Sequence, residues 1–249
     1  MADGKIEKKE KYRQWYHTMD LGNGEITDGI YNHRPLLKYY GFPESLKGKR
    51  VLDVGCSDGF FSFLFEEKGA AEVVALDAPA HKSDFFPLAK KRLNSKVKRC
   101  LMDVYDISPK TLGYFDFVFC GTVLLHLADP IRALRNIRNV IRNGEFVCAN
   151  PCLYIPLIGR ISHLFGKKFT IALLYSGRIK DGEVWAYWIP AEDCLRAMIY
   201  RAGFDSIEKV GNFTLRGCVK NGHGKTIGKG IFPHAVFKMK VLAERAGDK

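Results

Sequence analysis

The fold is decided by one stretch of sequence, Val51-Leu52-Asp53-Val54-Gly55-Cys56-Ser57-Asp58-Gly59. Its first four residues form a short apolar run, which predicts a buried strand. Phe60 to Lys68 then follows an amphipathic helical pattern that ends at Gly69. Glycines between a strand and a helix let the backbone turn sharply and come close to a ligand beside the helix N-terminus. The stretch therefore predicts a strand–loop–helix unit that holds a nucleotide-like molecule.

Strands and helices alternate on both sides of this unit. A further helix is expected over Pro130–Arg142, because Asp129 and Pro130 form a strong helix start. The seven expected strands are Val51–Val54, Glu72–Leu76, Lys98–Met102, Phe115–Cys120, Glu145–Ala149, Ser206–Phe213 and Ala235–Leu242. Short apolar strands separated by helices predict a doubly wound, Rossmann-like α/β sheet with both faces covered.

The core domain is expected to span 49–249, with an extension before it and an insertion within it. Residues 1–48 are expected to form a helical extension, with helices at Lys5–Trp15 and His33–Tyr40. An insertion at about 151–183 contains an unusually apolar run from Leu153 to Tyr175, which predicts a lid over the site. Because basic residues interrupt the apolar run, a position on a membrane surface is the alternative.

The composition indicates which partners and which cellular compartment to expect. The 249 residues carry a formal net charge of +12, which favours anionic partners. Seven cysteines are scattered without any CxxC pair, so we expect a reducing, cytoplasmic setting without disulfides or zinc. The histidines show no ligand spacing, so no metal is expected. Met1 to Lys11 is too polar for a secretory signal.

The chemistry of the loop selects among nucleotide-like ligands. Its glycines follow the spacing G-x-x-x-G, and Asp53 and Asp58 would repel a pyrophosphate. The same two acids suit a ligand with an ammonium and a sulfonium, which indicates S-adenosylmethionine (SAM). The expected cofactor contacts within the loop are Asp53, Gly55, Cys56, Ser57, Asp58 and Gly59.

Three later segments complete the expected cofactor site. Asp77 ends the second strand, where an acid can accept hydrogen bonds from both ribose hydroxyls. Asp103 and Val104 follow the third strand, where they are expected to bind the adenine edge. Gly121, which ends the fourth strand, is a further expected contact. All of these positions fall at the carboxyl ends of strands, the edge where such sheets bind ligands.

Two sets of residues carry a resemblance to a known family. Residues 51–61 resemble the first motif of class I SAM-dependent methyltransferases, and Val123 to Pro130 resembles their segment after the fourth strand. Trp15-Tyr16-His17, with residues 20–24 and Thr27, resembles the N-terminal segment of the tRNA wobble-uridine (mo5U34) methyltransferase-like family. The resemblance covers roughly residues 12–150 and 185–212.

One position departs from that family. Members that use a carboxylated SAM carry a tyrosine directly before the motif histidine, and Leu125 stands there in this chain. The resemblance therefore implies ordinary SAM as the cofactor.

Methyl transfer needs a base only where the acceptor must lose a proton. His126 follows the fourth strand and is a candidate base; the alternative is that it orders the loop before Asp129. His17 could close over the site, or it could serve in packing. The aromatic residues expected around the acceptor, with core packing as the alternative, are Trp15, Tyr16, Trp185 and Trp188.

The sequence thus predicts an enzyme, a SAM-dependent methyltransferase whose acceptor is a small or medium-sized organic molecule. A tRNA base methyltransferase is the second hypothesis, supported by a basic stripe expected along one helix, Arg132, Arg135, Arg138 and Arg142. A SAM-binding protein without catalysis is the third. The sequence carries no signal for an oligomeric state.

Overall fold

The computed structural model describes residues 14–153, 170–174, 186–211 and 214–219. Seven strands form one sheet in the order β10-β11-β7-β6-β3-β4-β5. Neighbours from β7 to β5 run parallel, and β11 runs antiparallel to both β7 and β10. The strands are β3 (Arg50–Val54), β4 (Glu72–Asp77), β5 (Lys98–Leu101), β6 (Phe115–Gly121), β7 (Ile141–Ala149), β10 (Ser206–Gly211) and β11 (Thr214–Val219). The expected doubly wound, Rossmann-like sheet is confirmed.

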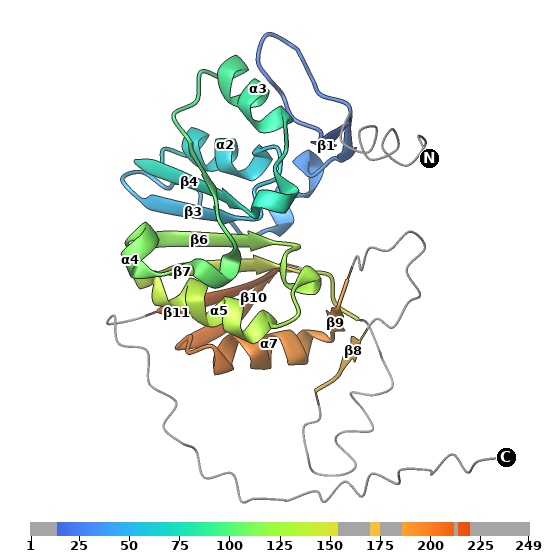
Figure 1. Ribbon diagram of the computed structural model, residues 1–249, viewed down its shortest axis with the longest axis vertical. Coiled ribbons are helices and arrows are strands. Elements are labelled where there is room, and N and C mark those ends of the chain that lie inside the picture. The colour runs from blue at the N-terminus through green and yellow to red at the C-terminus, as the bar shows by residue number, and fades with distance from the viewer. Residues whose placement is uncertain (1–13, 154–169, 175–185, 212–213, 220–249) are drawn as a thin grey trace, which may run out of the picture.

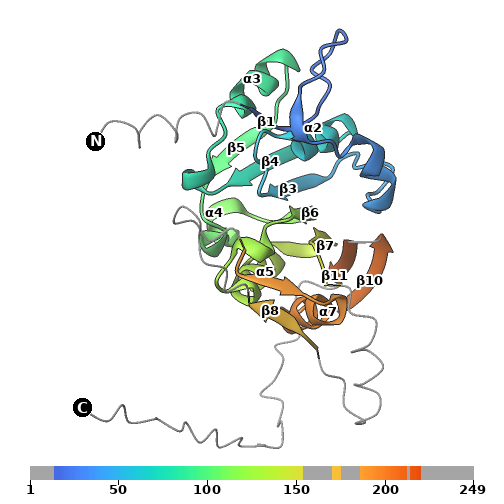
Figure 2. The ribbon, with the colours of Figure 1, turned by 90° about the vertical axis from the view of Figure 1, so that its right-hand side faces the viewer.

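Helices cover both faces of the sheet, as the nearly continuous burial of its central strands requires. Val51 packs with α2 (Phe60–Glu67) and α3 (Phe85–Arg92). Leu52 and Val54 pack with α5 (Pro130–Asn139) and α7 (Glu192–Arg201). Figures 1 and 2 show α2 and α3 toward the β3 and β4 end of the sheet, and α5 and α7 toward the β7, β10 and β11 end. A short α4 (Pro109–Leu112) precedes β6.

The described part of the N-terminal extension differs from the helical prediction. It consists of two short parallel strands, β1 (Trp15–His17) and β2 (Gly29–Tyr31), followed by the 3-10 helix η2 (Arg34–Tyr39). The helix expected at His33–Tyr40 is thus present in a tighter form. Most of the expected helix at Lys5–Trp15 lies outside the described residues. A helix across β1 is excluded because its backbone N–H groups bind a side chain of the core domain, as described below.

The prediction of a basic stripe along one helix is wrong. The helix α5 ends at Asn139, and Arg142 already lies in β7. Arg138 is buried, and its Nε donates a hydrogen bond to the Gly203 carbonyl (3.1 Å). The predicted helix ran too far because Val140 and Ile141 continue its apolar pattern, but both are buried under the sheet. Arg132 and Arg135 remain as the exposed members on α5, and Arg142 is exposed on β7.

The seventh strand lies earlier in the chain than expected. The sequence placed it at Ala235–Leu242, which lies outside the described residues, and the structure places β11 at Thr214–Val219. Gly217 interrupts the pattern that would have revealed this strand. A Cβ atom there would lie 2.8 Å from the Phe204 ring, so close packing explains the glycine.

The described part of the expected lid is short. The strand β8 (Ala172–Leu174) pairs antiparallel with β9 (Trp188–Pro190). The rest of the insertion beyond Leu153 lies outside the described residues, so its role as a lid stays a prediction. Among the described helices, none combines the length and apolar character needed to cross a membrane.

A buried acid lies in the middle of the sheet. Asp53 in β3 is 1% exposed and accepts a hydrogen bond from Ser62 Oγ in α2 (2.5 Å). Burial raises the pKa of Asp53 to about 7, against the Ser62 hydrogen bond, which lowers it. A raised pKa means that folding favours the protonated carboxyl.

We predict that Asp53 destabilises the fold as the pH rises from 4 to 7. Over this range the unfolded chain ionises Asp53 while the folded chain holds the proton, so stability is lost. The rise from the ordinary value 3.8 to about 7 corresponds to on the order of 4 kcal/mol. Urea unfolding at pH 4 and at pH 7 should show that Asp53→Asn does not lose this free energy of unfolding. The exposed Asp84→Asn is the matched control, and equal pH dependence of all three proteins would contradict the prediction.

Candidate functional site

The glycine loop between β3 and α2 has a fixed and partly strained backbone. Gly55 has φ +81°, and a Cβ atom there would lie 2.3 Å from Val123 Cγ2. Gly59 has φ +98°, and a Cβ atom there would meet the Phe63 ring at 2.6 Å. Ser57 adopts a left-handed φ of 50°, which is unusual for a residue with a side chain. The loop is therefore a shaped backbone cradle of the kind that a closely approaching ligand needs.

Asp77 lies against this loop, as the sequence predicted from its place at the end of β4. Its Oδ2 accepts a hydrogen bond from the Ser57 backbone N–H (2.7 Å), and its Oδ1 accepts one from the Ala78 N–H (2.9 Å). Burial raises the pKa of Asp77, and these two N–H donors oppose the rise. Each carboxylate oxygen accepts more than one hydrogen bond, so Asp77 keeps capacity for a ligand hydroxyl.

The remaining expected cofactor residues follow the neighbouring strands. Asp103 is exposed at the end of β5, and its Oδ1 accepts a hydrogen bond from the Tyr105 N–H (2.9 Å). Val104 is buried beside it, and Cys56 is buried in the loop. Gly121 ends β6 and is followed by Thr122, which has a left-handed φ of 57°. Four parallel strands thus bring these residues to one edge of the sheet.

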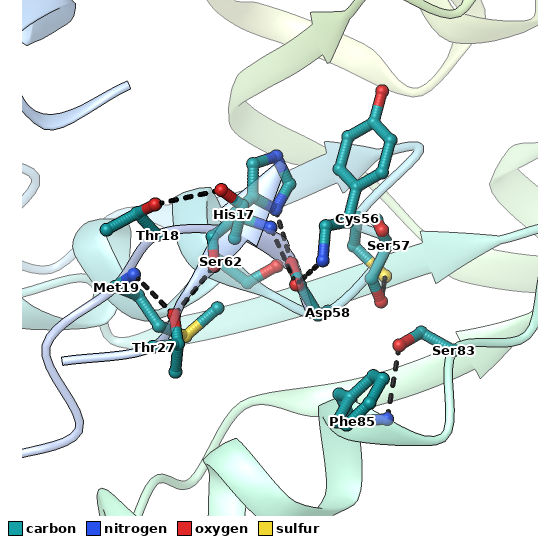
Figure 3. A network of polar contacts seen from close by, with 12 residues as sticks. His17, Thr18, Met19, Thr27, Cys56, Ser57, Asp58, Ser62, Ser83 and Phe85 are labelled. Atoms are coloured by element: carbon teal, nitrogen blue, oxygen red, sulfur yellow. Dashed lines mark hydrogen bonds and ion pairs between the residues drawn. The ribbon is translucent and has the colours of Figure 1, made fainter. Parts of the chain in front are cut away.

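Asp58 contacts the N-terminal segment, which sequence reasoning missed. It is fully buried, and its Oδ2 accepts hydrogen bonds from the backbone N–H groups of Tyr16 and His17 (2.8 Å each). Its Oδ1 contacts Nδ1 of the His17 ring. Figure 3 shows this junction, where Thr27 also accepts from the Met19 N–H and donates to the His17 carbonyl (2.8 Å each).

This junction changes the interpretation of two predicted residues. Both Asp58 oxygens are already engaged by the chain, so the direct cofactor contact expected of Asp58 stays a prediction. His17 is 4% exposed, and its ring stacks 5.5 Å from Phe60. Its expected role as a base also stays a prediction. The two halves of the junction are 41 residues apart in sequence, so spacing gave no signal for their pairing.

His126 lies on the other side of the site. It is exposed at the end of the 3-10 helix η5 (Leu124–His126), and its backbone N–H donates to the Val123 carbonyl (2.9 Å). The segment around β9 packs on this helix. The Tyr187 N–H donates to the Leu125 carbonyl (2.6 Å), and Trp188 Nε1 donates to the Ala128 carbonyl (3.4 Å).

The four aromatic residues that were expected to bind the acceptor do not share one environment. Trp188 lies beside η5, and Trp185 lies outside the described residues. Trp15 packs 4.7 Å from the Phe85 ring, which favours the packing alternative, whereas Tyr16 is 38% exposed. Within the described ranges no group of three or more potential ligands could hold a metal ion.

Comparisons with known proteins agree with this geometry. A family model described as a methyltransferase domain matches residues 52–149. A tRNA U34 carboxymethyltransferase from Campylobacter lari is 26% identical over 68% of this chain and 54% of its own length. The chain spans between about a third and about half of the length of the curated relatives it matches.

Solved structures share the fold at low sequence identity. The N-terminal domain of EvdMO1, crystallised in the presence of SAH and D-fucose, has a TM-score of 0.58 at 16% identity. The match covers 88% of this chain and 98% of that one. A 1,6-didemethyltoxoflavin-N1-methyltransferase from Burkholderia thailandensis has a TM-score of 0.50 at 18% identity, covering 71% of this chain and 72% of that one. Residues 52–149 therefore match a methyltransferase domain model, and the chain shares the Rossmann-like fold of these solved structures.

Proposed function

We propose that this protein is a SAM-dependent methyltransferase that acts on a small or medium-sized organic acceptor. The observation that carries the proposal is Asp77, which the Ser57 N–H holds against the glycine loop within the matched domain. Two structural neighbours were crystallised with S-adenosylhomocysteine (SAH), the product of SAM, which supports the same cofactor here.

The residues present fit this cofactor. The glycine loop has the sharply turned backbone that such a cofactor needs, with Gly55 at φ +81° and Gly59 at φ +98°. Asp77 would accept hydrogen bonds from the ribose hydroxyls, and Asp103 would bind at the adenine edge. When bound, SAM supplies a methyl group on a positive sulfonium, and the buried acid Asp77 beside the glycine loop would favour that charge.

The chain's own contribution to the reaction is to orient the partners and exclude water. His126, exposed at the carboxyl edge of β6, is the residue we propose to take a proton from the acceptor where one must leave.

The free cysteines support the cytoplasm as the compartment; they are residues 56, 100, 120, 148, 152, 194 and 218.

A second candidate is a tRNA wobble-uridine methyltransferase. The specific observation in its favour is the set of relatives named tRNA U34 carboxymethyltransferase. Leu125 favours an ordinary methyl group over a carboxymethyl group in either case. The basic stripe that supported an RNA substrate is broken, because Arg138 is buried and Arg142 lies in β7, so we favour the small acceptor. Binding of SAM without catalysis is the third candidate.

We predict that Asp77→Ala weakens SAM binding by about 10- to 100-fold, because the variant loses hydrogen bonds to a charged group and the support of the Ser57 N–H. Isothermal titration with SAM and with SAH measures this directly. Asp193→Ala, an exposed acid on α7, should bind both as the wild type does. Absence of saturable binding to the wild type would refute all three candidates.

The two enzyme candidates differ in the partner that receives the label from methyl-tritiated SAM. We predict incorporation with the small-molecule fraction of a cell extract and none with purified tRNA. Tritium in tRNA, with tRNA binding that weakens steeply between 50 and 200 mM salt, would instead establish the RNA candidate. Incorporation into neither fraction, despite SAM binding, would favour the non-catalytic candidate.

A further inference from the structure

Tyr16, already expected to bind the acceptor, belongs to a continuous group of four side chains in the N-terminal segment. Tyr40 Oη and His33 Nδ1 share a hydrogen bond of 2.8 Å. The rings of Tyr31 and His33 stack 6.2 Å apart, and those of Tyr16 and Tyr31 lie 4.9 Å apart. We call this group, Tyr16, Tyr31, His33 and Tyr40, the tyrosine face.

The tyrosine face lies beside the glycine loop, at the ligand-binding edge of the sheet. The Tyr40 ring is 5.2 Å from Phe61, which follows the loop, and 6.0 Å from Phe119 near the carboxyl end of β6. The His33 ring is 5.4 Å from that of His17, which is held on Asp58. The face is therefore next to the residues proposed to hold the cofactor, on the side where an acceptor must approach.

Two of its rings are accessible although a large aromatic core lies beneath them. Tyr16 is 38% exposed and Tyr31 is 46% exposed, whereas Phe61 is buried. Adjacent exposed rings next to a binding site are typical of a surface that a ligand covers. Core packing alone would not require their neighbouring arrangement at this position.

Three groups of the tyrosine face, Tyr16, His33 and Tyr40, have pKa values shifted in the direction that favours their neutral forms. Burial, followed by the neighbouring Tyr31 and the acids Asp58 and Asp77, raises the pKa of Tyr16 to about 12. Burial likewise raises the pKa of Tyr40 to about 12. Burial and the nearby His17 lower the pKa of His33 to about 4, against the opposing effect of Asp58. At neutral pH these groups therefore offer hydrogen bonds and not charges.

The nearest carboxylates do not change the neutral character of the tyrosine face. Asp58 already accepts the N–H groups of Tyr16 and His17, and Asp77 accepts those of Ser57 and Ala78. An anionic acceptor would lose its water shell here without gaining an opposite charge, and the carboxylates that could attract a cation are already engaged by the chain. A flat neutral ring would stack on the exposed tyrosines, and groups on its edge would find hydrogen-bonding partners.

We propose that the tyrosine face binds the methyl acceptor, and that the acceptor is an uncharged planar ring with hydroxyl or carbonyl groups at its edge. The inference rests on the proposed methyltransferase function. Tyr16 and Tyr31 supply the stacking surface. The hydrogen-bonded Tyr40 and His33 fix the rotation of the ring in its plane, and so orient the acceptor atom for in-line transfer.

The test uses the full chain saturated with SAH and two probes of matched size, catechol and trans-cyclohexane-1,2-diol. Both carry two neighbouring hydroxyls, but only catechol is planar. Binding is measured by ligand-observed saturation-transfer NMR titration at pH 7. The variants are Tyr31→Leu, which removes an exposed ring, and Tyr40→Phe, which removes only a hydroxyl. Tyr200→Phe, a 61% exposed tyrosine on α7, is the matched control.

We expect catechol to bind the SAH complex and the saturated diol to bind at least tenfold more weakly. Tyr31→Leu and Tyr40→Phe should each weaken catechol binding about threefold to tenfold, with Tyr200→Phe unchanged. Equal binding of the two probes, no binding of catechol, or unchanged catechol binding in both variants would overturn the inference. Failure of the wild type to bind SAH would overturn the proposed function itself, so the two failures are distinguishable.

Discussion

The Asp58 carboxylate is the contact on which the acceptor side of this protein depends. It is fully buried, and a buried carboxylate is costly unless its oxygens accept hydrogen bonds. The donors come from β1, through the Tyr16 and His17 backbone and the His17 ring. The N-terminal segment therefore supplies the partners that satisfy this buried carboxylate of the glycine loop. The same contact helps to hold the tyrosine face at the edge of the sheet, together with the Thr214 hydroxyl, which donates to the Tyr39 carbonyl.

Adjacent residues of the loop form hydrogen bonds with different strands. The Ser57 N–H donates to Asp77 on β4, while the Asp58 side chain accepts from β1. These ties hold Ser57 in its left-handed conformation, and Thr122 has a similar φ where β6 ends. Backbone strain of this kind persists at binding sites only where the surroundings hold it. The chain's own contacts thus shape the loop, and a loop held in place by the protein lowers the conformational cost of binding.

Sequence reasoning succeeded where local pattern decides the structure. The apolar strands from Val51 onward, the start of α5 at Asp129-Pro130 and the place of Asp77 at the end of β4 all follow from patterns within a few residues. It failed where tertiary contacts override the pattern. Val140 and Ile141 extend the helical period of α5, yet burial in the sheet makes them the entry to β7.

The sequence by itself determined the order of strands and helices, the glycine loop and the acids at the strand ends, because each is encoded by neighbouring residues. Only the tertiary structure decided the partners of those residues. Asp58 reads in the sequence as a cofactor ligand, and it holds β1 because folding brings together groups 41 residues apart. His33 and Tyr40 belong to no recognisable sequence motif. Their pairing beside the loop follows from the same docking of the N-terminal segment, which no local pattern encodes.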